Sequence, residues 1–300
     1  MSSKEDIILK IDDLYKRFKG ADFNVIDGVS LTINRGEVVG LIGKNGAGKT
    51  TLMKMIAKTK RPTSGAIFLN DIDIFQHHNI LKNVGIMINT VHFKHFSAKK
   101  NLTYYLKVNH KTQYLKNIDN ILDLVGLSHT YGKKVKDFSF GMKQRLSLAM
   151  CLVDEPEIAI MDEPFVGLDP DGVNTLIHSL RTWASKKGTA LLISSHQLNE
   201  LAEVCDRFVL LKEGKLQNID FNKEQLIKIV VKEQIYPEHR QELLNLFSTI
   251  KDIEEKAVIM QSGSEEYNEI INYLVKYYTL ENTINEQDNL YQYFDGFERK

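Results

Sequence analysis

The sequence has little cysteine. Its 300 residues contain two, Cys151 and Cys205, which lie far apart and match no metal-binding spacing. This usage is typical of a reducing compartment and predicts buried thiols that act as small hydrophobic groups. Net charge is also absent, because 39 Lys and Arg residues balance 39 Asp and Glu residues. The chain therefore has no overall electrostatic preference for nucleic acid or for an anionic membrane.

Long apolar runs are missing as well. No stretch approaches the roughly 20 apolar residues that a transmembrane helix needs, and residues 1–6 contain no apolar signal region. Any membrane role is therefore expected to depend on a partner. The composition, 43% hydrophobic and 26% charged, is that of a globular protein, and the length allows one large domain with an appendage or two modest domains.

The most informative stretch is Gly43–Thr51, which matches the pattern G-x-x-x-x-G-K-[ST]. The apolar run Val38–Ile42 precedes it and Leu52–Ala57 follows with helical spacing, so the pattern lies between a predicted buried strand and a helix. Its three glycines let backbone N–H groups turn inward around a polyphosphate, and the helix N-terminus adds partial positive charge. We expect Lys49 to reach the β- and γ-phosphates and Thr50 to place its hydroxyl on Mg²⁺.

Two acidic residues follow another predicted strand. The apolar run Ile158–Met161 leads directly into Asp162 and Glu163. We expect Asp162 to hold Mg²⁺ through water and Glu163 to polarise the water that attacks the γ-phosphate. His196 follows the buried strand predicted over residues 190–195. Because strand carboxyl ends share one edge of a parallel sheet, His196 is expected near the γ-phosphate as a hydrogen-bond donor.

Two further candidates each have two interpretations. Asn89 ends the apolar run Val84–Ile88 and could contact Mg²⁺ or the attacking water, or be an ordinary loop residue. The alternating segments 7–11 and 25–33 predict an antiparallel β flap before the phosphate-binding pattern. Phe18 lies between these segments and could stack on a purine base or pack in the core of the flap.

From about residue 101 the pattern of apolar residues is that of helices. Apolar residues recur at three- and four-residue spacing, which predicts an inserted helical subdomain over about residues 95–155. Ser139 and Gly141 stand at the start of its last helix, where a hydroxyl and open N–H groups form either a second anion site or only a helix N-cap. Asp169 begins the next helix and is either its N-cap or a contact across an interface.

The tail, residues 221–300, is predicted to form a small α/β accessory domain. Segments 227–231 and 256–260 have the pattern of strands, and segments 237–247 and 265–278 have the pattern of amphipathic helices. A last predicted helix has an apolar stripe that packs in the core or contacts a partner. The residues of this stripe are Leu290, Tyr291, Phe294 and Phe297.

Taken in order, these segments make residues 1–220 resemble the nucleotide-binding subunit of ATP-binding-cassette (ABC) transporters. In that family Gly43–Thr51 corresponds to the Walker A motif, Asp162 ends the Walker B motif with Glu163 as the catalytic carboxylate, and His196 corresponds to the switch histidine. The D-loop matches at Gly167–Asp169. The residues that the resemblance places at the nucleotide are Phe18, Gly43, Asn45, Gly46, Gly48, Lys49, Thr50, Thr51, Asn89, Ser139, Gly141 and Asp169, with Thr50, Asp162 and Asn89 at Mg²⁺.

The resemblance also implies a dimer. Two family subunits close head to tail, so that Ser139 and Gly141 of one would touch the γ-phosphate of ATP held by Lys49 of the other. The family's Leu-Ser-Gly-Gly-Gln signature stands here as Phe-Ser-Phe-Gly-Met over residues 138–142, so Phe140 replaces a glycine, and Asn89 replaces the Q-loop glutamine. These departures bear on the tightness of the dimer and on its coupling to a membrane partner.

The implied fold is α/β: a P-loop NTPase core with the antiparallel flap and the helical subdomain, plus the small C-terminal α/β appendage. The implied function is hydrolysis of Mg-ATP, as a homodimer or a heterodimer, at the cytoplasmic face of a bacterial membrane to power a separate permease, with no nucleic-acid partner. The pattern is most similar to the bacitracin-resistance and lantibiotic-immunity branch, which implies export of a peptide or hydrophobic compound. The alternatives are a non-transport ABC ATPase and a regulatory subunit that binds ATP without turnover.

Overall fold

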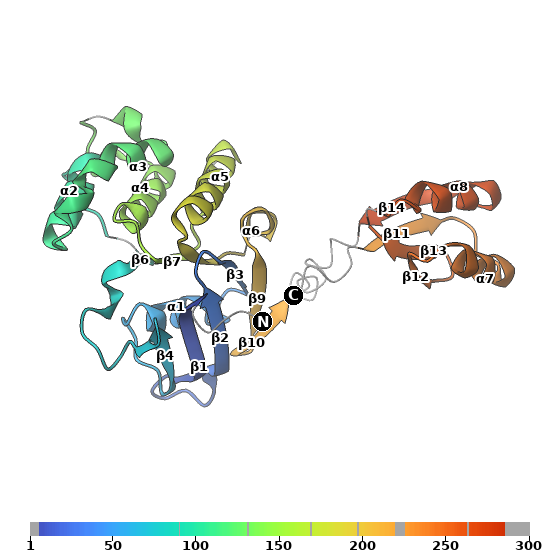
Figure 1. Ribbon diagram of the computed structural model, residues 1–300, viewed down its shortest axis with the longest axis horizontal. Helices are drawn as coiled ribbons and strands as arrows, with labels where there is room; N and C mark the ends of the chain where they lie inside the picture. Colours follow the sequence, from blue (N-terminus) through green and yellow to red (C-terminus); the bar gives the residue numbers. More distant parts are fainter. Residues whose placement is uncertain are drawn as a thin grey trace. The chain divides into compact units, whose positions relative to one another are not determined.

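The computed structural model describes residues 6–89, 91–130, 132–168, 170–196, 198–219, 226–262 and 264–285. The chain divides into two compact units, residues 1–219 and 220–300 (Figure 1). Within the described residues, no helix is both long enough and apolar enough to cross a membrane. Cys151 and Cys205 are buried free thiols, as predicted, and burial raises the pKa of both.

A six-stranded sheet forms the centre of the first unit. Its strands lie in the order β10-β9-β3-β8-β7-β6, and those from β9 to β6 are parallel. The strands are β3 (Val38–Ile42), β6 (Val84–Met87), β7 (Ile158–Asp162), β8 (Ala190–Ser194), β9 (Arg207–Lys212) and β10 (Lys215–Ile219). Every residue of β3 and β8 is buried, as their continuous apolar runs predicted. The carboxyl ends of β3, β8, β7 and β6 therefore meet along one edge of the sheet.

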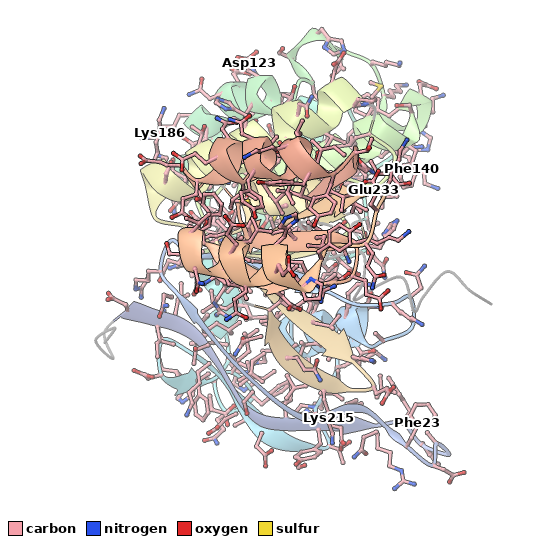
Figure 2. The ribbon with its side chains drawn as sticks, turned by 90° about the vertical axis from the view of Figure 1, so that its right-hand side faces the viewer. Phe23, Asp123, Phe140, Lys186, Lys215 and Glu233 are labelled. Atoms are coloured by element: carbon pink, nitrogen blue, oxygen red, sulfur yellow. The ribbon has the colours of Figure 1, made fainter. Side chains whose placement is uncertain are left out.

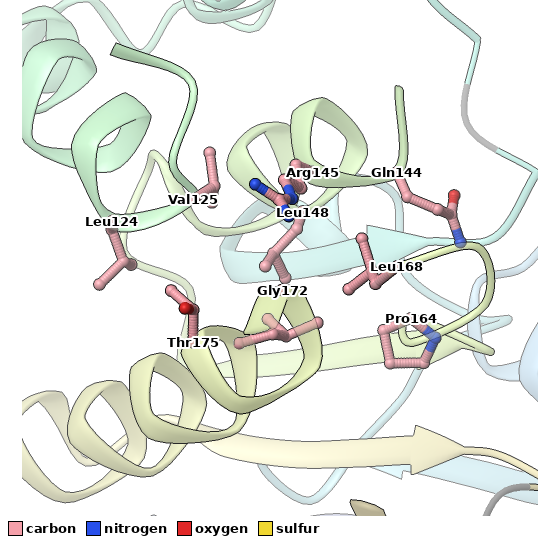
Figure 3. A pocket seen from close by; sticks show the side chains of 10 residues that line it. Leu124, Val125, Gln144, Arg145, Leu148, Pro164, Leu168, Gly172 and Thr175 are labelled. Carbon is pink, nitrogen blue, oxygen red and sulfur yellow. The ribbon is translucent and has the colours of Figure 1, made fainter. Parts of the chain in front are cut away.

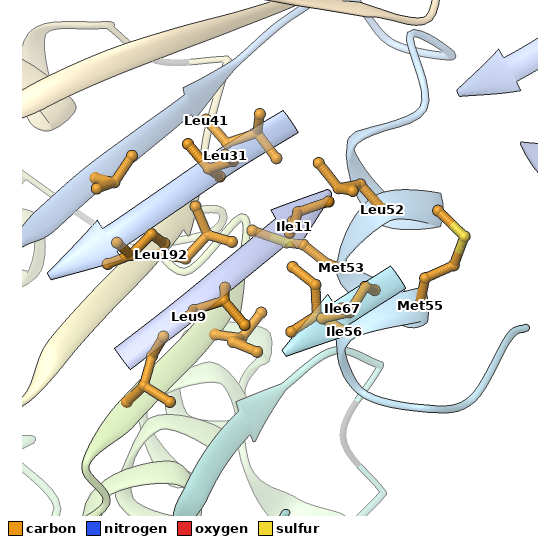
Figure 4. Close-up of a cluster of buried hydrophobic side chains, with 14 of the residues drawn as sticks. Leu9, Ile11, Leu31, Leu41, Leu52, Met53, Met55, Ile56, Ile67 and Leu192 are labelled. Atoms are coloured by element: carbon orange, nitrogen blue, oxygen red, sulfur yellow. The ribbon is translucent and has the colours of Figure 1, made fainter. Parts of the chain in front are cut away.

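The antiparallel flap is a second sheet, in the order β2-β1-β4-β5. Its strands are β1 (Ile7–Arg17), β2 (Asn24–Asn34), β4 (Ser64–Leu69) and β5 (Ile72–Asp73). Helix α1 (Lys49–Ile56) contributes Leu52 and Met53 to a buried cluster that also contains Leu9 of β1, Ile67 of β4 and Leu192 of β8 (Figure 4). The flap and the central sheet thus enclose α1 in one core, which fixes the N-terminus of α1 at the sheet edge.

Helices α2 (Ala98–Val108), α3 (Ile118–Leu124) and α4 (Phe140–Leu152) pack on one another and form the predicted inserted helical segment. Serine side chains begin two of them, since Ser97 Oγ accepts from Lys100 N at 3.2 Å and Ser139 Oγ accepts from Met142 N at 3.2 Å. The helical pattern before α3 begins as a 3₁₀ turn, and two short 3₁₀ turns connect α3 to α4. The remaining elements of this unit are the 3₁₀ turns η2 (Ile80–Asn83), η3 (Thr112–Asn117), η4 (Ser128–Thr130) and η5 (Val135–Asp137) and the helices α5 (Pro170–Lys187) and α6 (Leu198–Val204).

The second unit has the element order β-α-β-β-α-β, with an antiparallel sheet ordered β12-β13-β11-β14. This is the ferredoxin-like arrangement. Its elements are β11 (Leu226–Val231), α7 (Pro237–Leu246), β12 (Ile250–Ile253), β13 (Ala257–Gln261), α8 (Tyr267–Tyr277) and β14 (Leu280–Asn285). Both predicted strands and both predicted helices are present, whereas β12 and β14 were not predicted. The predicted stripe from Leu290 to Phe297 lies outside the described residues.

Candidate nucleotide-binding and hydrolysis site

The loop between β3 and α1 is held close to the backbone of β9. A Cβ placed on Gly43 would lie 2.5 Å from the carbonyl oxygen of Leu211, so only glycine allows this approach. Gly48, the N-cap of α1, has a φ of 107°, and no side chain caps the helix there. Asn45 and Gly46 are exposed at the outer side of the loop. The loop thus presents uncapped N–H groups at a helix N-terminus, which is the arrangement that binds phosphate.

The ammonium group of Lys49 lies between this loop and the acidic end of β7. Its Nζ donates to the carbonyl oxygen of Gly43 at 2.6 Å and lies 3.8 Å from Oε1 of Glu163. The residue is 6% exposed. Burial lowers the pKa of Lys49, although the negative charges of Glu163 and Asp162 oppose this effect. A buried cation with few water contacts is well suited to a strong interaction with a phosphate group.

A chain of oxygen atoms joins α1, β7 and β8. Thr50 Oγ1 donates to Asp162 Oδ2 at 2.8 Å, and Ser194 Oγ donates to Asp162 Oδ1 at 2.6 Å. Hydroxyl and carboxylate oxygens are the ligands that Mg²⁺ prefers, so these residues fit a magnesium ion bound through one or two protein groups. The structure therefore brings together Thr50 and Asp162, two of the three residues predicted for Mg²⁺, and no described contact joins the third, Asn89, to them.

Glu163 contacts His196 at the neighbouring strand end. The carboxylate Oε2 of Glu163 lies 2.8 Å from Nδ1 of His196, and its side chain is 24% exposed, so water reaches it. The backbone of Glu163 is fixed by β8, because its N–H donates to both the carbonyl and the hydroxyl oxygen of Ser194 at 3.1 Å. This geometry allows Glu163 to accept a proton from water, and the contact with Glu163 uses only Nδ1 of His196 and not the second ring nitrogen, Nε2.

Two residues of this site were not predicted from the sequence. Ser194 contacts both Asp162 and Glu163, and Gln144 Nε2 in the first turns of α4 donates to the carbonyl oxygen of Glu163 at 3.1 Å. The position of Ser194 at the end of a predicted strand was the available signal, since its neighbours on β7 end in the two acids. Nothing local in the sequence indicates the contact of Gln144, which depends on how α4 packs.

Ser139 and Gly141, the two signature residues predicted at the nucleotide, contact residues outside the phosphate-binding loop. Ser139 caps α4 and is exposed, and Gly141 lies so close to Gly167 that a Cβ would be 2.7 Å from the Gly167 carbonyl oxygen. None of the described contacts links Ser139 or Gly141 to Lys49. The predicted role of these two residues at a γ-phosphate thus has no intramolecular counterpart among the described residues.

The remaining candidates are dispersed. Phe18 is 36% exposed, and the ammonium groups of Lys16 and Lys60 lie 5.5 and 4.9 Å from the centre of its ring. Asn89 is exposed, has a left-handed φ of 48°, and follows β6 beside β7. Asp169 lies outside the described residues. No group of three or more metal-ligating His, Cys, Asp or Glu side chains occurs in the described part of the chain.

These contacts and the strand order define a P-loop NTPase, and comparisons with known proteins identify its family. Residues 26–166 match the ABC transporter family. The chain is 36% identical over 222 residues to the uncharacterized ABC transporter ATP-binding protein YhcH of Bacillus subtilis, covering 73% of this chain and 72% of that protein. It is 37% identical over 213 residues to the bacitracin transport ATP-binding protein BcrA of Bacillus licheniformis, covering 70% and 68%. The chain belongs to the ABC transporter family of ATP-binding proteins.

A solved structure agrees with this assignment. The cbiO1 protein from Clostridium perfringens, part of the ABC transporter complex cbiONQ, is 30% identical, has a TM-score of 0.63, and covers 71% of this chain and 88% of its own. The predicted family, fold class, ATPase class and bacitracin-resistance-like branch are confirmed. The roles of individual site residues stay predictions.

Proposed function

We propose that the chain hydrolyses Mg-ATP as one half of a head-to-tail dimer and thereby powers a separate membrane permease. The single observation that carries the hydrolysis step is the contact of Glu163 with His196 at 2.8 Å, with the ammonium of Lys49 only 3.8 Å from the same carboxylate. A base, a proton donor and a buried cation thus converge where a γ-phosphate held by the loop would lie.

In the proposed reaction each residue has a separate task. The loop N–H groups and Lys49 hold the phosphates, and Lys49 exchanges its bond to the Gly43 carbonyl for a phosphate oxygen. Thr50 and Asp162 would hold Mg²⁺, which supplies neutralisation of the charge that develops on the phosphates. Glu163 orients the attacking water and accepts its proton, and His196 donates a hydrogen bond to the transferred phosphoryl group.

The second half of the site is proposed to come from another cassette. Ser139 and the first N–H groups of α4 form an anion-binding helix terminus, yet their described contacts do not include the Lys49 loop. A head-to-tail dimer would place this terminus over the nucleotide held by its partner. Both a homodimer and a heterodimer with a second ABC ATPase satisfy this requirement.

A groove beside the helical segment is proposed to receive the permease. It has a volume of about 710 Å³ and lies between the edge strand β6 and helix α2. Val84, Ile86 and Val108 provide apolar surface, and Lys58 and Lys82 provide positive charge. These properties fit an amphipathic helix with acidic residues from the cytoplasmic side of a permease. The strand β6 leads to the Q-loop position, so docking there would reach the nucleotide site.

The exported compound is inferred from the relatives. BcrA is a bacitracin transport protein, which supports a peptide antibiotic or another hydrophobic compound as the cargo of the proposed transporter. The chain would then act at the cytoplasmic face of the membrane, attached through its permease. This inference about the cargo does not depend on the proposed mechanism of ATP hydrolysis.

The proposal is tested by ATP turnover of the full chain, alone and co-purified with a candidate permease, against Glu163→Gln. We expect turnover that rises with the permease and falls by about 100-fold or more in Glu163→Gln, because general-base catalysis contributes about 10²–10⁴-fold. A variant that still binds ATP but does not turn it over supports the role of Glu163. Equal turnover of the variant and the wild type contradicts it.

The docking groove is tested separately with two matched substitutions. Val108→Glu places a charge in the groove at a residue that is 56% exposed, and Val275→Glu makes the same change at a residue of the second unit that is 55% exposed. We expect Val108→Glu to lose co-purification with the permease and Val275→Glu to keep it. The reverse result would place the permease contact elsewhere.

A second candidate function is a regulatory cassette that binds ATP without turnover. It is favoured by Phe140, which replaces a signature glycine and is 60% exposed at the start of α4. A bulky ring there could keep two cassettes apart. Binding of ATP without any turnover, even with the permease present, would support this alternative.

A further inference from the structure

Helix α4 contacts the catalytic segment at two points. Gln144 Nε2 donates to the carbonyl oxygen of Glu163 at 3.1 Å. Four residues earlier, the ring of Phe140 covers Gly167, where a Cβ would lie 2.2 Å from ring carbon Cδ1. Residues four apart lie on the same face of a helix. The first turns of α4 therefore hold both ends of the segment between Glu163 and Gly167.

The backbone of Glu163 needs such support. Its φ of 51° is left-handed, which is unfavourable for a residue with a Cβ. The N–H of Glu163 is held by Ser194 of β8, as described above, and the carbonyl is held by Gln144 of α4. Strand β8 and helix α4 thus fix the peptide groups on the two sides of the residue that carries the carboxylate.

Packing also holds this segment, because the side chain of Phe165 is 1% exposed, and one small cavity borders it. A cavity of about 20 Å³, room for about one water molecule, lies between α4, α5 and the segment after Glu163. Figure 3 shows Gln144 and Leu148 of α4 on one side of this cavity and Pro164 and Leu168 on another. The contacts of Gln144 and Phe140 therefore act together with the burial of Phe165 in placing the segment.

We propose that Phe140 and Gln144 are positioning residues that set the place of the Glu163 carboxylate and link it to the helical segment. The inference rests on the proposed function, because it assigns Glu163 the role of base. It gives Phe140, which can be located by its label in Figure 2, a role within its own chain. The phenyl ring in place of the family's glycine is then an anchor for the segment after Glu163.

The test separates catalysis from binding. Gln144→Met keeps the length of the side chain and removes the donor, and Phe140→Ala removes the ring without weakening the helix. We expect each variant to lower kcat by at least about tenfold, on a scale where displacing a reacting group by about 1 Å costs about 100-fold. The Kd for ATP, measured with a fluorescent ATP analogue, should not change because Lys49 and Thr50 are untouched.

Conservative and remote variants complete the design. Phe140→Tyr keeps the ring and should keep the wild-type kcat. Tyr236→Ala removes an aromatic side chain that is 64% exposed, similar to the 60% of Phe140, and should also keep it. Wild-type or higher kcat in both Gln144→Met and Phe140→Ala, with Glu163→Gln inactive in the same assay, overturns this inference alone. Equal turnover of wild type and Glu163→Gln removes the proposed function and this inference together.

Discussion

The edge of the central sheet and the first turn of α4 carry the two groups of residues expected to touch ATP, and the structure arranges them differently. At the sheet edge, Thr50 contacts Asp162 at 2.8 Å and Lys49 lies 3.8 Å from Glu163, and Ser194 links the two acids. At the start of α4, Ser139 contacts its own helix. The comparison teaches that a single chain assembles one half of the predicted site and presents the other half outward.

The cause of this difference is the geometry of parallel strands. The carboxyl ends of β3, β7 and β8 meet at one edge, so the loops that follow them converge even though 112 positions separate Thr50 from Asp162 and 32 separate Asp162 from Ser194. Helix α4 instead belongs to an inserted segment, and its residues Gln144 and Phe140 contact the segment that begins at Glu163. The predictions below separate the two halves, from the largest expected effect to the smallest.

The largest effect concerns complementation between the halves. Lys49→Ala and Ser139→Ala should each abolish most turnover, because each removes an essential contact from both sites of a homodimer. A mixture of the two variants contains heterodimers with one intact site. Random exchange should therefore recover about a quarter of wild-type turnover, measured after equimolar mixing.

Each variant mixed with wild type controls for subunit exchange in this experiment. Absence of recovery despite demonstrated exchange contradicts a head-to-tail homodimer. In that case a heterodimer with a different ABC ATPase would be tested next.

The next effect concerns Ser194, which joins the two acids at the sheet edge. Ser194→Ala removes the bonds of its hydroxyl to Asp162 and Glu163 and keeps the backbone bond to Glu163. It should lower kcat by about tenfold and stability by about 1–3 kcal/mol, because buried polar partners lose a hydrogen bond. Ser179→Ala is the matched control, since Ser179 is 5% exposed and donates to the Thr175 carbonyl within α5. Urea titrations should show losses for both variants, with kcat reduced only for Ser194→Ala. If Ser194→Ala and wild type had equal kcat, Ser194 would have only a structural role.

A smaller effect compares two helix caps. Ser139→Ala and Ser97→Ala each remove an N-cap and should each cost about 1 kcal/mol of stability. Only Ser139→Ala should also lower ATP turnover, because Ser97 begins α2, away from the expected nucleotide contact. Thermal melts and ATPase assays of the two variants measure both quantities. Loss of turnover in both would mean that helix stability, and not the Ser139 hydroxyl, explains the effect.

The smallest effect concerns the charge of Lys49. Burial lowers its pKa below the ordinary 10.5, so between the lowered value and 10.5 the unfolded chain binds more protons than the folded chain. Without nucleotide, the stability of wild type relative to Lys49→Met should therefore rise as pH rises toward about 10.5. Urea titrations of both proteins at several pH values measure this difference. A difference that is independent of pH would show that the lysine is not desolvated in solution.

The sequence predicted the fold well where a pattern is local. The strand before the phosphate loop, the helix after it and the two acids at the end of β7 each depend on a few adjacent residues, and all are where the sequence placed them. In the second unit, strands β12 and β14 were not predicted from the sequence. The first has only four residues, and the second alternates weakly, with Leu280 and Ile284 among polar neighbours.

The features of the candidate site likewise fall into those that local sequence predicts and those that depend on tertiary packing. By itself the sequence determined the phosphate loop, the placement of acids and a histidine at strand ends, and the family, because these are set by short segments whose backbone geometry follows from their own residues. Only the tertiary structure decided that Ser194 bridges Asp162 and Glu163 and that Gln144 holds the Glu163 carbonyl. Those contacts join residues 19 or more positions apart, and such distances are closed by packing of the whole unit, which no local pattern encodes.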